Sequence, residues 1–172
     1  MKSKAVPGIV FGLLAIAFVG YLVSSAAGLP DRMATHFDWQ GRPNDWMSRN
    51  NYLLVFGALG TGAAIIVVAI CFGVRFFPKW TINIPQRDYW LVPERRTQTF
   101  DFLLRWGFWL GCLFLGFLAG VHHLVVQANT RNPVVLPSGI ALISGLFAVG
   151  LVVWTAFLLV HFGKRARTDA AA

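Results

Sequence analysis

Residues 50–74 read NNYLLVFGALGTGAAIIVVAICFGV and contain no aspartate, glutamate, lysine or arginine. An α-helix rises about 1.5 Å per residue, so about 20 apolar residues cross the roughly 30 Å hydrocarbon core of a bilayer. Backbone N–H and C=O groups find no water at that depth, and a helix satisfies them within the segment itself. This stretch therefore predicts a transmembrane helix.

Three further stretches without these charged residues surround it in the chain: residues 5–30, 106–130 and 132–163. Each is long enough to span a membrane, and all are too long and too uniformly apolar for the strands of a membrane barrel. At 56% hydrophobic and 13% charged residues, the chain has too little polar surface to cover a water-soluble globule. We predict a single all-α membrane domain, residues 1–172, whose four transmembrane helices form a bundle near 7–29, 52–76, 102–126 and 138–162.

The first stretch has one alternative interpretation, a cleavable signal peptide. Lys2 and Lys4 precede it, and the small residues 24–28 end it. Its apolar part exceeds the length of a typical signal core, which favours a retained helix.

The distribution of basic residues predicts the orientation, because short loops rich in lysine and arginine stay in the cytoplasm. With both termini inside, eleven basic residues are cytoplasmic and four are outside. The inner set is Lys2, Lys4, Arg75, Lys79, Arg87, Arg95, Arg96, Arg105, Lys164, Arg165 and Arg167, and the outer set is Arg32, Arg42, Arg49 and Arg131. We expect the bilayer and its anionic headgroups as partners, and no nucleic acid, since the basic residues form no dense run or reading helix.

The segment between the first two predicted helices, residues 29–49, reads LPDRMATHFDWQGRPNDWMSR. Pro30, Gly41 and Pro43 oppose a helix, and residues 41–45 have the composition of a tight turn. The neighbouring residues 35–39 suit an extended piece that lies against the bundle. We therefore predict a structured extracytoplasmic cap after the first span.

This segment resembles the membrane domain family known as domain of unknown function 1648. The family pattern is Leu-Pro, Thr-His with an aromatic residue, Gly-x-Pro, and then an aromatic and a basic residue. The matching residues are Leu29, Pro30, Thr35, His36, Phe37, Gly41, Pro43, Trp46 and Arg49. Residues 83–96 are similar to the cytoplasmic stretch of short family members. The chain departs from the family at Ala34, where proline is usual, and in having four predicted spans where the SdpI-like members have more.

The resemblance implies a protein of the bacterial inner membrane, related to the SdpI immunity and signalling proteins. The function we expect is non-enzymatic: sensing, immunity-like protection or accessory binding of a partner. Its ligand-binding or sensing candidates in the cap are His36, Asp38, Trp39 and Trp46.

Histidine also suggests a metal or proton site, because the neutral imidazole ring is a common metal ligand. If the cap folds back on the bundle, such a site would draw on His36, Asp38, His122 and His123. In the competing interpretation His36 bonds the backbone of the cap, while His122 and His123 lie in the headgroup layer. Adjacent histidines point about 100° apart on a helix, so both would not easily face one ligand.

The cytoplasmic loop, residues 77–101, alternates charged and aromatic side chains. Rings that anchor in the interface, with basic groups on anionic lipid, explain this composition. Docking of a cytoplasmic protein is the alternative. The contact candidates for either role are Arg87, Tyr89, Trp90, Arg95 and Arg96.

Catalytic motifs give little support for an enzyme. The chain has no Gly-x-Ser-x-Gly elbow, no His-Glu-x-x-His and no glycine-rich phosphate loop, so we assign no catalytic residue and no required cofactor. The alternative function is a metal-dependent membrane enzyme, or an accessory subunit of a membrane complex, built on the outer histidines and aspartates.

Small residues predict where helices approach each other closely. Gly8 with Gly12, and Gly116 with Gly120, form GxxxG pairs, a pattern that lets two helix backbones meet in lipid. These faces hold the bundle together or, alternatively, mate with a second copy of the chain.

Overall fold

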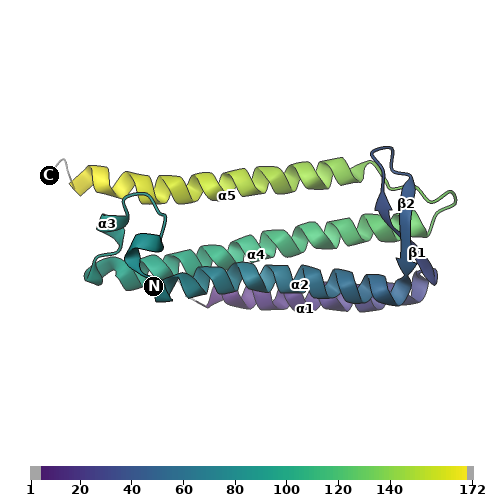
Figure 1. Ribbon diagram of the computed structural model, residues 1–172, viewed down its shortest axis with the longest axis horizontal. Helices are drawn as coiled ribbons and strands as arrows, with labels where there is room; N and C mark the ends of the chain where they lie inside the picture. Colours follow the sequence, from purple (N-terminus) through teal and green to yellow (C-terminus); the bar gives the residue numbers. More distant parts are fainter. Residues whose placement is uncertain (1–4, 170–172) are drawn as a thin grey trace.

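Four long helices dominate the computed structural model, which describes residues 5–169 and side chains as far as residue 163. They are α1 (Val6–Ser25), α2 (Arg49–Gly73), α4 (Pro93–Asn129) and α5 (Gly139–Asp169), and they run side by side along the long axis of the molecule (Figure 1). Each overlaps one predicted span and is long and apolar enough to cross a membrane. The predicted all-α membrane fold with four spanning helices is confirmed.

The helix α4 starts at Pro93, earlier than the span predicted from residue 102. Val92 before it is extended, and proline is well suited to the first turn of a helix, where its missing N–H would have no partner. With 37 residues the helix is about 55 Å long, well beyond the hydrocarbon core. The helix is therefore longer than one crossing requires.

The same helix, α4, is the centre of the packing, because α1, α2 and α5 all pack against it. In Figure 1, α5 lies on the side of α4 opposite to α1 and α2. Phe18, Leu22, Ala64 and Leu115 form the main buried cluster between α1, α2 and α4. The spanning part of α5 is the least buried of the four. The bundle is therefore three tightly packed helices with a fourth on one side.

Two glycines of α4 allow its close approach to α1 and α2. A Cβ atom added at Gly107 would lie 2.6 Å from Cβ of Cys71, and one added at Gly111 would lie 2.7 Å from the ring of Phe11. Gly12 and Gly116, from the predicted GxxxG pairs, have nothing within 4 Å of such an atom. The closest contacts therefore use a glycine pair that the sequence analysis did not single out.

The predicted cap is an antiparallel β-hairpin of β1 (Arg32–Phe37) and β2 (Pro43–Ser48), which confirms a structured segment after the first span. The turn lies at residues 38–42, ahead of the predicted 41–45. The Asp38 carboxylate accepts hydrogen bonds from the N–H groups of Gln40 and Arg42, at 2.9 and 2.8 Å. Gly41 adopts a φ of 78°, which a residue without Cβ reaches at no steric cost. These two residues fix the turn, and residues 43–45 belong to a strand.

The opposite end of the molecule holds the connection between α2 and α4. It consists of the short helices η2 (Val74–Phe76), η3 (Lys79–Thr81) and α3 (Arg87–Trp90), while η1 (Ala26–Gly28) ends α1 at the hairpin end. The indole of Trp90 donates to the carbonyl of Phe162 at 3.0 Å and so ties α3 to α5. We refer to the two ends as the hairpin end and the α3 end.

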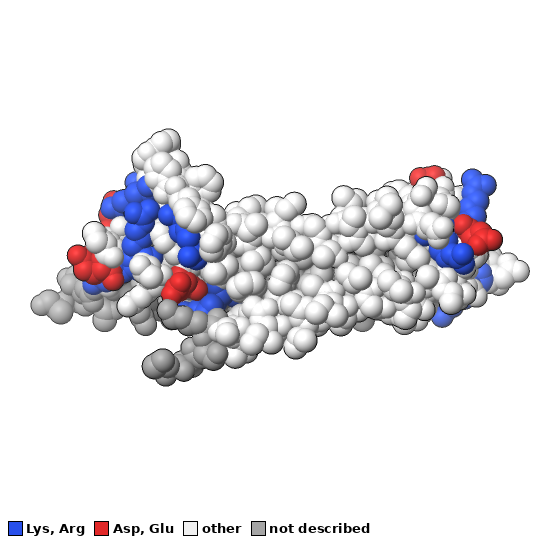
Figure 2. Space-filling model, turned by 90° about the horizontal axis from the view of Figure 1, so that it is seen from below, with Lys and Arg blue, Asp and Glu red and all other residues white. Residues whose placement is uncertain are grey.

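Charged side chains gather at these two ends and leave an uncharged belt between them on the face shown in Figure 2. The described basic side chains at the hairpin end are Arg32, Arg42, Arg49 and Arg131, and those at the α3 end are Arg75, Lys79, Arg87, Arg95, Arg96 and Arg105. Five basic residues assigned to the cytoplasm lie outside the described residues or side chains: Lys2, Lys4, Lys164, Arg165 and Arg167. Figure 1 shows that α1 begins and α5 ends at the α3 end. An even number of spans requires that the first helix begins and the last helix ends at the same end of the bundle, as they do here.

Candidate functional site

The hairpin is fastened to α4 by one buried side chain, Asn129. Its Oδ1 accepts the N–H of Ala34 at 2.7 Å, and its Nδ2 donates to the carbonyl of Ala34 at 2.9 Å. The same Nδ2 donates to the carbonyl of Val125 at 2.9 Å. The amide thus pairs with Ala34 as a neighbouring strand would, and both of its polar atoms are used. Because these groups are buried, leaving any of them without a partner would be costly.

Two further contacts hold the tip and the base of the hairpin. At the tip, the N–H of Leu136, in the link between α4 and α5, donates to the carbonyl of Gly41 at 2.9 Å. At the base, Arg49 donates to the carbonyl of Leu29 at 3.0 Å and lies 3.3 Å from the Asp31 carboxylate. The hairpin is therefore a fixed part of the fold and can form one wall of a site.

A groove of about 440 Å³ lies under the hairpin, which supplies Thr35, His36 and Met47 to it. The helices α2 and α4 supply its apolar floor, chiefly Val55, Phe56, Leu59, Ala63, Phe114 and Leu118. We call this space the hairpin groove. Its volume is in the range of about 300–1,000 Å³ typical of small-molecule sites. From Tyr52 to Ala63 it follows α2 for about 16 Å, roughly half of the hydrocarbon core.

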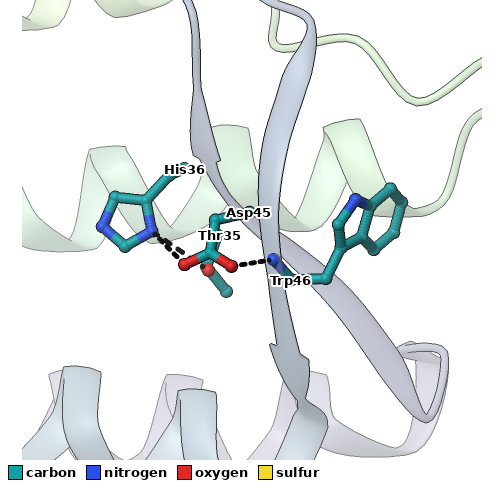
Figure 3. A network of polar contacts seen from close by, with 4 residues as sticks. All are labelled: Thr35, His36, Asp45 and Trp46. Carbon is teal, nitrogen blue, oxygen red and sulfur yellow. Dashed lines mark hydrogen bonds and ion pairs between the residues drawn. The ribbon is translucent and has the colours of Figure 1, made fainter.

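The polar end of the hairpin groove is formed by His36, which faces Asp45 across the hairpin (Figure 3). Nδ1 of His36 lies 3.3 Å from Oδ2 of Asp45, and about two thirds of each side chain is exposed. The other oxygen of Asp45 accepts the N–H of Trp46 at 2.8 Å, which fixes the carboxylate. The site therefore offers an oriented imidazole beside a carboxylate, at the mouth of an apolar floor.

The sequence candidates in the cap do not form one site. Asp38 is occupied by the backbone of the turn, as described above. Trp39 is 92% exposed at the tip of the hairpin, and in Figure 3 the ring of Trp46 points away from His36. Asp45 was not among the candidates. The feature that identifies Asp45 is the strand register. A turn at residues 38–42 places Asp45 opposite His36.

The predicted metal site of His36, Asp38, His122 and His123 is not assembled. Among the residues that the structure describes, no three His, Cys, Asp or Glu side chains are grouped so that they could hold a metal ion. His122 is fully buried and bonded within the bundle, and His123 bonds the hydroxyl of Tyr21 and the amide of Gln127, both at 2.8 Å. The competing placement of His122 and His123 in the headgroup layer stays a prediction. The two adjacent rings have different hydrogen-bond partners, as their helical spacing suggested.

His122 joins three helices through both of its ring nitrogens. Nδ1 lies 2.9 Å from the hydroxyl of Tyr52 on α2, and Nε2 lies 2.9 Å from the hydroxyl of Ser25 on α1. The Ser25 hydroxyl also donates to the carbonyl of Leu22 at 2.9 Å. Since Ser25 has one proton to donate, its oxygen accepts from Nε2–H, and Nδ1 accepts from Tyr52. With this tautomer every proton in the series has an acceptor.

This hydrogen-bond series reaches the hairpin groove directly, because Tyr52 also lines the groove. The ring of Tyr52 stacks on Phe56 and on His122, with centroids 5.4 and 5.7 Å apart. A molecule in the groove would therefore touch a side chain whose hydroxyl is bonded to the centre of the bundle.

The contact candidates from residues 77–101 have separate roles at the α3 end. Trp90 is 6% exposed and is a structural link to α5, so it does not lie at the surface as expected for a lipid anchor. Arg87 donates to the carbonyl of Trp80 at 3.0 Å, and Arg96 lies over the ring of Phe100. The Arg95 guanidinium lies 3.9 Å from the ring centroid of Tyr89.

The fold and the groove define a class, a four-helix membrane protein with a β-hairpin fixed over a groove at one end of its spans. Residues 10–61 match the family model for a domain of unknown function, DUF1648, so this part of the chain carries a DUF1648 domain. The match runs from α1 through the hairpin into α2, which are the elements that carry most of the hairpin groove. No curated protein matches the chain. No solved structure matches it.

Proposed function

We propose that this chain is a non-enzymatic protein of the bacterial inner membrane that binds a lipid-like amphiphile in the hairpin groove. The proposed orientation places both termini in the cytoplasm and the hairpin outside. Six of the ten described basic side chains lie at the α3 end, which supports this orientation by the positive-inside rule. The observation that carries the proposal is the groove itself, an apolar floor that ends at the paired side chains of His36 and Asp45.

The shape and polarity of the groove favour a molecule with one apolar chain and a small polar head. The floor is about one leaflet deep, so an acyl chain could lie along α2 in the direction that neighbouring lipid chains take. At the mouth, the hydroxyl of Thr35 and the imidazole of His36 offer hydrogen bonds, and the carboxylate of Asp45 disfavours an anionic head. The expected ligand therefore has a neutral or cationic head.

An immunity-like or signalling role is consistent with this ligand class. A protein that removes a membrane-active amphiphile from the outer leaflet would protect the cell in the way the resemblance to SdpI-related proteins implies. For signalling, Asn129 and His122 connect the hairpin and the groove wall to α4. That helix continues to the α3 end, where a cytoplasmic partner would bind. The geometry gives no comparable support for a metal-dependent enzyme.

The test is photocrosslinking in vesicles that contain the full-length protein. The probe is a single-chain amphiphile with a cationic head and a photoreactive group in its chain, and crosslinked peptides are mapped by mass spectrometry. We expect crosslinks concentrated between Val55 and Ala63 and at Phe114. The variant Ala63→Phe fills the groove and should reduce these crosslinks about tenfold, which corresponds to about 1.4 kcal/mol.

A matched control is Ala58→Phe, which adds the same ring to an exposed position of α2 outside the groove. It should leave the crosslinking unchanged. Crosslinks distributed evenly around the lipid-facing surface, with no difference between the two variants, would contradict the proposal. Equal crosslinking by an amphiphile with an anionic head would reject the assigned role of Asp45 and the predicted head chemistry.

A further inference from the structure

A second, polar cavity of about 250 Å³ lies at the α3 end, between α3, α4 and α5. Its charged lining consists of Arg95 and Arg105, and Gln98 and Thr99 add polar groups. No aspartate or glutamate belongs to the described lining. The cavity therefore concentrates positive charge and hydrogen-bond donors in a small space, at the end of the molecule opposite to the hairpin groove.

The two arginines are oriented before any ligand arrives. The Arg95 guanidinium lies over the ring of Tyr89 at 3.9 Å from the centroid, which fixes the plane of its N–H donors. Nε of Arg105 donates to the carbonyl of Asp101 at 3.3 Å. Within the described part of the chain, the terminal nitrogens of Arg105 have no hydrogen-bond partner. The terminal nitrogens of Arg105 are therefore available to a group that brings its own acceptors.

The wall of the cavity is rigid because three elements interlock around one histidine. The ring of His161 stacks on Phe102, with centroids 3.7 Å apart, and on Trp90, with centroids 5.3 Å apart. Thr99 donates to the carbonyl of Trp90 at 3.0 Å, and the Trp90 indole holds Phe162. A ligand would therefore meet a preformed site, and less of its binding energy would be lost in ordering side chains.

We propose that this cavity binds a phosphate group, and that its usual source is the headgroup of an anionic phospholipid. Planar guanidinium groups match the geometry of phosphate oxygens and form charge-assisted hydrogen bonds with them. Three facts favour a lipid over a soluble phosphate. The cavity adjoins the start of the uncharged stretch at Trp106, its wall carries the large apolar ring of Phe102, and α5, which forms one side, is the least buried of the four apolar helices.

This inference does not depend on the hairpin groove, although the proposed orientation would place the cavity on the cytoplasmic leaflet. The test is native mass spectrometry of the full-length protein released from detergent, with phosphatidylglycerol and phosphatidylcholine added in separate titrations. We expect preferential retention of phosphatidylglycerol. Arg95→Gln and Arg105→Gln should each weaken that retention by about tenfold, or about 1.4 kcal/mol.

The control is Arg96→Gln, which removes the same charge one residue further along α4. Its guanidinium lies over Phe100 and donates to the carbonyl of Arg75, outside the cavity. It should retain phosphatidylglycerol as the wild type does. A second variant, Gln98→Glu, keeps both arginines and places a carboxylate beside the cavity, so it should also weaken retention even if the arginine variants fold poorly.

A third arm adds soluble glycerol phosphate as a competitor. Displacement of the lipid only by a large excess would identify the headgroup as the source, and displacement at equal concentration would identify a soluble phosphate as the ligand of the same site. Equal retention of both lipids, or the same loss for Arg96→Gln as for Arg95→Gln and Arg105→Gln, would overturn the inference.

Discussion

The hydroxyl of Tyr52 lies 2.9 Å from Nδ1 of His122, and both side chains are buried where α1, α2 and α4 meet. The pair connects a wall of the hairpin groove to the centre of the bundle. In a bilayer neither group can turn to water if its partner is lost. Removing these hydrogen bonds by substitution therefore tests whether they hold the three helices together.

Two single substitutions in this pair should each destabilise the protein, by different amounts. Tyr52→Phe leaves Nδ1 without a donor and should lower the free energy of unfolding by about 1 kcal/mol, near the measured range for hydrogen bonds in membranes. His122→Ala also opens a cavity among Tyr21, Tyr52 and Phe56, so we expect a loss of about 3 kcal/mol. Unfolding curves in detergent measure both effects.

The control for that series is His123→Ala, because His123 is exposed and adjacent in sequence. It should change stability by less than either variant. If His122→Ala unfolds at the same denaturant concentration as the wild type, the buried series does not hold the helices.

Replacing the amide nitrogen of Asn129 by an oxygen should weaken the attachment of the hairpin to α4, although the side chain keeps its size. Asn129→Asp keeps the shape of the side chain but replaces Nδ2 by an oxygen that faces the carbonyls of Ala34 and Val125. Two lost hydrogen bonds and a buried charge should release the hairpin, at a cost of about 1–3 kcal/mol for each unpaired buried group. Hydrogen exchange of the β1 amides should accelerate, whereas Gln127→Glu at the same end of α4 should leave it unchanged. Equal protection of β1 in Asn129→Asp and wild type would show that Asn129 is not the clamp.

Gly107 and Gly116 should respond differently to the same substitution. In Gly107→Ala the new methyl would meet Cβ of Cys71, which is attached directly to the backbone and cannot rotate away, so α2 and α4 must separate. We expect a loss of about 1–3 kcal/mol, as for overpacked cores. Gly116→Ala has open space and should be neutral. The unfolding free energies of the two variants in detergent make the comparison, and equal effects would contradict the packing of α4 against α2.

The four spans could be predicted from the sequence, because a charge-free stretch of sufficient length has few other stable conformations in lipid. Which face of each helix turns inward could not. Lipid is as apolar as a protein core, so hydrophobic periodicity does not mark the buried face, and GxxxG patterns occur on both faces. This is why Gly107 and Gly111 were missed while the open Gly116 was selected.

The candidate site was predictable only in part, for related reasons. His36 was selected, but its partner Asp45 depends on a strand register that includes a bulge. For His122 the sequence left a metal site and the headgroup layer open, whereas a polar side chain within a span is also expected to face the bundle interior and to find a partner there. Tyr52 and Ser25, polar residues at the same depth on other helices, were the signal that pointed to those partners.

At the α3 end, the hydrogen bond and charge of Lys79, 2.9 Å from Asp88, hold the pKa of that carboxyl below its usual range. Because the pKa is lower in the folded state, the pair stabilises the loop at pH values above the unfolded pKa. This contribution is lost as the pH falls through the folded pKa. Lys79→Met should raise the pKa of Asp88, and Arg87→Gln should raise it less, since the charge of Arg87 is the smaller cause. A carboxyl-resonance titration by NMR measures both, and an unchanged midpoint in Lys79→Met would reject the pair.

The orientation of the chain in the membrane is the central claim. It places the hairpin groove on the outer side and the phosphate cavity on the cytoplasmic side. The direct measurement is labelling of single cysteines by a membrane-impermeant maleimide in spheroplasts, with Cys71 and Cys112 replaced by serine. Trp39→Cys stands at the exposed tip of the hairpin, and Lys79→Cys stands in the connection at the α3 end. We predict that Trp39→Cys is labelled in intact spheroplasts and that Lys79→Cys is labelled only after permeabilisation. Labelling of Lys79→Cys in intact spheroplasts, with Trp39→Cys protected, would contradict the proposed orientation.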